Sequence, residues 1–195
     1  MKRLLLLSLL LLVSGCGENT PPTKIMIDIK NPDGDKMGTA TLQEKATGLS
    51  VGLDLKGLEP GPHAIHFHET GECEPPDFES AGDHYNPEDK DHGLLNPEGS
   101  HAGDLPNIIA DSDGTVLVEL MAPGVTLKEG KTTLYLKNGT SLVVHEKADD
   151  GMSQPAGNAG KRIACGVISI EEQMNKDKKK EKVVDIEERK KEEGK

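Results

Sequence analysis

A chain of 195 residues, 29% of them charged and only 2% aromatic, accommodates one domain with a sizeable core, because domains cluster at about 100 to 150 residues. The formal net charge is −11, and residues 16–170 alone carry −13, because segment 171–195 holds nine acids and nine bases and the first residues hold two bases. Such a charge argues against binding to nucleic acid and against attachment to anionic lipid through charge alone.

The first element in the chain is a short apolar segment. Lys2 and Arg3 precede an apolar run that ends at Val13, which is typical of a signal peptide over residues 1–15 and is too short for a membrane span of about 20 residues. Residues 13–16 read Val-Ser-Gly-Cys, which resembles a bacterial lipobox, whose cysteine receives lipid. We therefore expect export and a lipid anchor at Cys16, with the mature chain extracytoplasmic, at the cell surface or in a periplasm. Ordinary signal cleavage nearby is the alternative.

A tether over residues 16–23 leads to a region, 24–170, of short apolar patterns with a period of two. The patterns are KIMIDIK, TATLQ, LSVGLDLKGL, TVLVELM, TTLYLK, SLVVHEK and ACGVISI, and turn sequences separate them. This spacing predicts seven or eight antiparallel strands in an all-β sandwich or barrel. Segments 69–105 and 148–161 break the pattern, and loops of this length are commonly functional.

Histidines gather in two groups. His66 and His68 are two residues apart, so on a strand both rings point to one face while Phe67 points to the other. His145 ends a predicted strand and can approach the pair, giving three imidazoles that suit copper or zinc. The loop supplies three nitrogens and one carboxylate, a set suited to structural zinc, from His84, His92, His101 and Asp104. For His63 we expect a packing role.

The cysteines favour one disulfide. Once Cys16 is assigned to lipid, Cys73 and Cys165 remain. An even pair in an exported protein indicates a single long-range bridge. Two buried free thiols are the alternative, which fits poorly with export.

Five motifs together resemble the copper/zinc superoxide dismutase family over residues 24–170. They are HFHE at 66–69, GDHYNP around His84, the spacing of His92, His101 and Asp104, VVHEKADD at 143–150, and GNAGKRIACGVI at 157–168. The resemblance implies an eight-stranded Greek-key β-barrel or sandwich, immunoglobulin-like, with two long functional loops.

The resemblance also implies a set of site residues. Copper would be bound by His66, His68, His84 and His145, and zinc by His84, His92, His101 and Asp104, with His84 as a bridging imidazolate. Arg162 would attract superoxide beside the copper, Asp149 would link the two ligand groups, and Cys73 and Cys165 would form the family's disulfide. The implied reaction converts superoxide to oxygen and hydrogen peroxide by Cu(II)/Cu(I) cycling, with zinc in a structural role.

Some features depart from the family's pattern. Segment 148–161 is shorter than in animal enzymes, which leaves substrate guidance to Arg162 with Lys147 and Lys161 as helpers. Segment 69–82 also differs. The surfaces that set dimerisation in the family cannot be matched to this sequence, so the oligomeric state stays open, with a homodimer as one possibility. Residues 171–195 are predicted to be disordered or a fraying charged helix, with a tail that binds a partner as the alternative.

A different class of function competes with the enzyme. It is a copper-binding or trafficking lipoprotein on the same scaffold without significant dismutase activity. Some exported relatives have lost copper ligands, whereas all four copper positions are histidine here. A purely structural or adhesive β-domain would leave seven suitably spaced ligands idle, and is therefore disfavoured.

Overall fold

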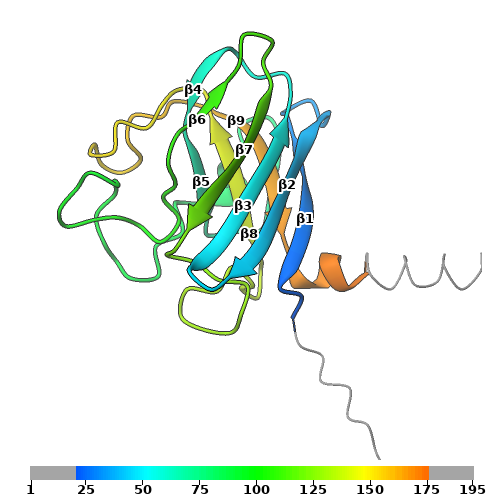
Figure 1. Cartoon of the computed structure of the whole chain (residues 1–195), viewed down its shortest axis with the longest axis vertical. Helices are drawn as coiled ribbons and strands as arrows, with labels where there is room; N and C mark the ends of the chain where they lie inside the picture. The colour runs from blue at the N-terminus through cyan, green and yellow to red at the C-terminus, as the bar shows by residue number, and fades with distance from the viewer. Residues whose placement is uncertain (1–20, 176–195) are drawn as a thin grey trace, which may run out of the picture.

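The computed structural model of the chain describes residues 21–175 (Figure 1). The expected signal peptide, Cys16, most of the tether and the tail after residue 175 lie outside these residues. The strands are β1 (Lys24–Lys30), β2 (Lys36–Lys45), β3 (Gly48–Leu55), β4 (Gly61–His63), β5 (Ile65–His68), β6 (Ile108–Ala110), β7 (Val116–Ala122), β8 (Thr140–His145) and β9 (Arg162–Ile168), with a short 3-10 helix at Glu79–Ala81.

The strands form a curled antiparallel sheet, as Figure 1 shows, and this confirms the all-β prediction. Seven strands pair in the order β5-β8-β9-β1-β2-β3-β7, and β4 pairs with β6 in a second, two-stranded sheet. Strand β1 therefore lies between its neighbour in sequence, β2, and the last strand, β9. The first long loop, 69–105, connects β5 to β6 of the second sheet, and the second, 148–161, connects the paired neighbours β8 and β9.

Strand β1 shows why the sequence forms this sheet. Ile25, Ile27 and Ile29 are at most 4% exposed, while the residues between them face solvent. Alternate residues of a strand point to opposite faces, and burying each isoleucine contributes about 1.5 to 3 kcal/mol. Aliphatic side chains from the other strands complete one core with very few aromatic residues, as the composition predicts.

The predicted strand over residues 132–137 is wrong. This segment makes only an isolated bridge between Thr126 and Thr133. Its alternation arises because Leu134 is fully buried in the core, while its backbone carbonyl accepts a hydrogen bond from the Thr140 hydroxyl at 2.8 Å instead of joining a ladder. Strands β4 and β6, three residues each, are too short to show a period and were not predicted.

The described start of the C-terminal tail is ordered against the domain. Residues 170–175 are helical, and Gln173 is only 5% exposed. The prediction for the rest of the tail, residues 176–195, lies outside the described residues. Within residues 21–175, no helix has the length and apolar character needed to cross a membrane.

Candidate metal centre

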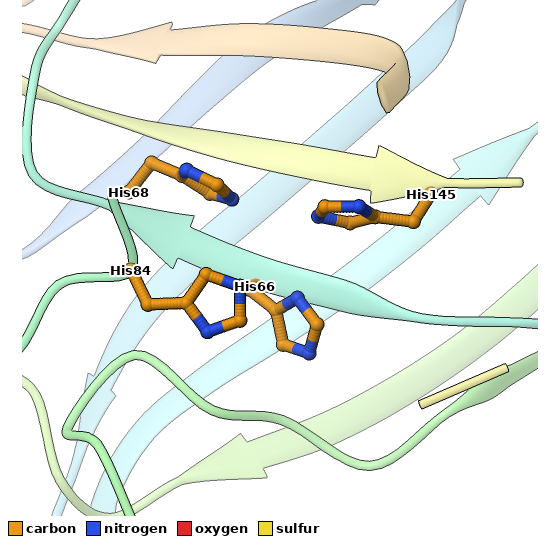
Figure 2. A group of neighbouring side chains, drawn as sticks. All are labelled: His66, His68, His84 and His145. Atoms are coloured by element: carbon orange, nitrogen blue, oxygen red, sulfur yellow. The ribbon is translucent and has the colours of Figure 1, made fainter. Parts of the chain in front are cut away.

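The histidine groups lie on the face of β5 and β8 that points away from the core. Phe67 of β5 is fully buried in the main core, so His66 and His68 point to the other face, as the two-residue spacing predicts. His145 ends β8, where the pairing with β9 shifts register. Figure 2 shows these three rings with His84, which comes from the loop after β5.

The loop is attached to β5 through its backbone. Phe67 N donates to Gly103 O at 2.9 Å, Tyr85 N donates to Phe67 O at 2.8 Å, and Gly103 N donates to Tyr85 O at 2.8 Å. A Cβ at Gly103 would lie 2.5 Å from Phe67 O, so only glycine allows this approach. The contacts bring His84 and Asp104, next to Tyr85 and Gly103 in sequence, beside the strand histidines.

Two groups of side chains can each hold a metal ion, and His84 belongs to both. Within each group, one ligand atom per residue lies within 4.8 Å of every other. The first group is His66, His68, His84 and His145, and the second is His84, His92, His101 and Asp104. Every residue that the sequence assigns to a metal therefore lies in one of these groups.

Buried nitrogen atoms without hydrogen-bond partners show that the first group fits a metal. His66 Nδ1, His68 Nε2, His84 Nε2 and both ring nitrogens of His145 have no partner among the described residues. An unpaired buried polar atom costs about 1 to 3 kcal/mol, and a metal ion satisfies several such lone pairs at once. Imidazole nitrogen is a good ligand for copper and for zinc.

Burial keeps His68, His84 and His145 neutral, as metal binding requires. Burial, together with the neighbouring imidazoles, lowers the pKa of His84 to about 4 and that of His145 to about 3. Burial and the nearby His84 also lower the pKa of His68. At neutral pH the lone pairs of these rings are therefore available.

The second group is organised around one carboxylate. Asp104 Oδ1 lies 3.0 Å from His84 Nδ1 and 3.3 Å from His101 Nδ1, and its Oδ2 lies 3.1 Å from His92 Nδ1. Burial alone would raise the pKa of Asp104, but hydrogen bonds from these histidines and from Gly93 N hold it well below its usual range. Three imidazoles and a carboxylate make a four-ligand set of the kind found in structural zinc sites.

Asp149 lies between the two groups. Its carboxylate accepts hydrogen bonds from His66 Nε2 at 2.9 Å and from His92 Nε2 at 3.1 Å. Burial would lower the pKa of His92, but hydrogen bonds to Asp104 and Asp149 outweigh it and raise this pKa to about 9. One carboxylate thus orients a histidine of each group.

Arg162 lines an open pocket that leads to the first group. His68, His84 and His145 lie in the same pocket wall. Among the described residues that line it, Arg162 is the only cationic side chain, and Glu69 and Asp83 are the carboxylates. Its guanidinium donates to Phe78 O at 2.7 Å and to Gly82 O at 2.8 Å. The expected helpers, Lys147 and Lys161, do not line the pocket.

The predicted disulfide between Cys73 and Cys165 is confirmed, with 5.8 Å between the Cα atoms. The disulfide ties to β9 the segment whose Phe78 and Gly82 carbonyl groups accept hydrogen bonds from Arg162. His63 lies outside both groups, and its ring nitrogens contact His145 O at 2.8 Å and Glu59 O at 2.7 Å, which agrees with a packing role.

Sequence reasoning missed two polar side chains of the site. Asn107 exchanges two hydrogen bonds of 2.9 Å with the Asp149 backbone. Gln154 does the same with the backbone of His92. Neither residue is part of a periodic pattern, and the only signal was a polar residue in or near a long loop.

Comparison with known proteins gives consistent results. The model of the family described as copper/zinc superoxide dismutase (SODC) matches residues 36–168. "Superoxide dismutase [Cu-Zn] 2" of Aquifex aeolicus is 53% identical over 147 residues, covering 74% of this chain and 86% of that protein.

Two solved structures are similar as well. One is a SOD-like protein from Bacillus subtilis, with a TM-score of 0.72 and 39% identity, covering 73% of this chain and 97% of that one. The other is the Cu/Zn superoxide dismutase from Brucella abortus, with a TM-score of 0.63 and 33% identity, covering 74% and 99%.

Proposed function

The chain belongs to the copper/zinc superoxide dismutase family and is an enzyme of that type, and on this premise we propose how its residues divide the work. The first group would hold copper through His66, His68, His84 and His145. The second would hold zinc through His84, His92, His101 and Asp104, and His84 belongs to both ligand sets.

The observation that carries this assignment is the convergence of unpaired buried nitrogens on one point. Four histidines direct such atoms into the first group, and no carboxylate belongs to it. The second group includes the charged carboxylate of Asp104. An all-imidazole set suits a redox-active copper ion, and a closed set with one carboxylate suits structural zinc.

When bound, copper supplies the one-electron chemistry by cycling between Cu(II) and Cu(I). In the overall reaction two superoxide anions and two protons give one oxygen and one hydrogen peroxide. The Arg162 guanidinium attracts the anion into the pocket, because it is the one cation among the described residues that line the pocket of a strongly acidic protein. His84 Nε2 is the atom at which the chain can hold a proton toward the pocket, since Nδ1 faces Asp104.

Metal analysis combined with a superoxide-consumption assay tests the proposal. We expect one copper and one zinc per chain and rapid turnover. His145→Ala should lose copper and activity but keep zinc, and His101→Ala should lose zinc first. Full zinc without copper, and no turnover after copper is supplied, would instead favour the copper-binding or trafficking lipoprotein.

We further propose that the enzyme is exported and anchored to a membrane by lipid on Cys16. The leader pattern over residues 1–16 supports this, and so does the disulfide, because such bonds persist outside the reducing cytoplasm. Mass spectrometry of the mature N-terminus should show lipid on Cys16, and Cys16→Ser should release the protein from membranes. Wild-type protein cleaved at another residue and free of lipid would refute the anchor. Sedimentation of the released protein tests the possible homodimer.

A further inference from the structure

The short segment 148–161 lies directly against the loop that carries His92. Leu95 N donates to Gly151 O at 3.1 Å. Gly93 has a φ of +115°, and a Cβ there would lie 2.1 Å from Gly151 O. The two backbones therefore approach so closely that no side chain fits between them, and position 93 requires glycine.

Gln154 completes this contact through a reciprocal pair of hydrogen bonds. His92 N donates to Gln154 Oε1 at 2.9 Å, and Gln154 Nε2 donates to His92 O at 2.9 Å and to Met152 O at 3.2 Å. The amide orientation follows from these partners, because its oxygen faces a donor and its nitrogen faces two acceptors.

The two bonds to His92 differ in importance. His92 is fully buried, so its backbone groups depend on protein partners. His92 O also accepts from Asn96 Nδ2 at 3.1 Å, whereas Gln154 Oε1 is the partner of His92 N within the described chain. Removing the Gln154 amide would therefore leave the His92 N–H unpaired, while its carbonyl would keep a partner.

We propose that Gln154 is a positioning residue for His92 and that it controls how long the second group retains zinc. The inference rests on the zinc assignment made above. The ring of His92 is held by Asp104 and Asp149, and Gln154 holds its backbone, so the ligand is fixed at both ends. Partners that orient a metal ligand commonly change metal affinity by about 10- to 100-fold.

The short segment thereby has a role other than guiding substrate by charge. Gln154, Pro155 and Ala156 form part of the pocket wall, and their neighbours carry the contacts to the His92 loop. In this chain the segment contacts the second group through Gln154, which holds the backbone of His92.

Three variants of the full chain test the proposal. Gln154→Met keeps the size of the side chain but loses all three hydrogen bonds. Gln154→Glu keeps an oxygen acceptor for His92 N. Gln43→Met is the matched control, since Gln43 lies on β2 outside both groups.

Each variant is loaded with copper and zinc, placed in excess chelator, and followed by a zinc-sensitive dye. We expect Gln154→Met to release zinc about 10- to 100-fold faster than the wild type, and Gln154→Glu to stay within about threefold of it. Gln43→Met should match the wild type. Urea unfolding of the metal-free variants separates this effect from a general loss of stability.

An unchanged release rate for Gln154→Met, with one zinc bound to the wild type, would overturn the inference alone. A Gln154→Met variant that has a lower urea midpoint but an unchanged zinc release rate would overturn it as well. A wild-type chain that binds no zinc would overturn the zinc assignment, and the inference with it.

Discussion

Reducing the Cys73–Cys165 disulfide should lower the free energy of unfolding of the metal-free protein by about 4 to 5 kcal/mol. The two cysteines are 92 residues apart in sequence, and the chain-entropy model gives about 4.6 kcal/mol for a loop of that length. Reduction removes no side chain, and although the two sulfur atoms must separate, Cys165 can keep its packing against Phe78 and Val143. The expected loss therefore comes from the greater freedom of the unfolded chain.

Urea unfolding of oxidised and reduced protein measures this loss. With a denaturant slope of about 2 kcal/mol per M, the midpoint should fall by about 2 M on reduction. The control is Cys73→Ala with Cys165→Ala, which should unfold near or slightly below the reduced midpoint and should not respond to reductant. A fall of less than about 0.5 M in the wild type would refute the reasoning.

The same reduction should affect the pocket. The carbonyl groups of Phe78 and Gly82 hold the Arg162 guanidinium, and both belong to the segment that the disulfide ties to β9. Reduced protein that keeps its metals should therefore turn over more slowly at low salt. The double alanine variant should show the same loss in the absence of reductant.

Three other perturbations follow from the site. Arg162→Ala should lower kcat/KM by about 10- to 100-fold at low salt and weaken its dependence on ionic strength, with metal content unchanged; an unchanged rate at low salt would contradict this. Asp149→Asn should weaken retention of both metals, by about 10- to 100-fold, in dialysis against chelator; loss confined to one metal would show that the carboxylate does not couple the groups. The metal-free protein should become less stable as the pH falls from about 6.5 toward 4, because the unfolded chain then binds protons at His84 and His145, whose folded pKa values are about 4 and about 3. Each contributes a loss of about 1.4 kcal/mol per pH unit. The raised pKa of His92, about 9, gives stability that is fully present below pH 6.5 and is lost as the pH rises through 9. Urea midpoints between pH 5 and pH 9.5 should therefore show a maximum, and a midpoint that rises below pH 6.5 would contradict the burial argument.

The strands with long alternating patterns could be predicted from the sequence alone. Segment 24–30 has one buried and one exposed face, and the isoleucines at every second position of its sequence match the buried face. The failure over residues 132–137 shows the limit of the method, because alternation reports which side chains are buried and not whether the backbone has a partner strand. Leu134 packs into the core from a loop, and no local pattern distinguishes it from a strand residue.

The site was predictable to different degrees. The spacing of His66 and His68 fixed their common face, since it depends only on strand geometry. The loop residues His84, His92 and His101 follow no period. Their residue types suggested a zinc set, and the resemblance to a family added the place of His84 in the copper group. Gln154 could not be predicted, because its partner is 62 positions away and its contact depends on how two loops fold against each other.

The position of β9 in the sheet bears on how the protein is made. This strand pairs with β8 and also contacts β1, so the first and last strands of the domain are neighbours. During synthesis the N-terminal strands must wait for residues 162–168 before the sheet can be completed and Arg162 and Cys165 can take their places. The contact between β1 and β9 therefore forms only after nearly the whole domain has been synthesised, and it joins the two ends of the domain.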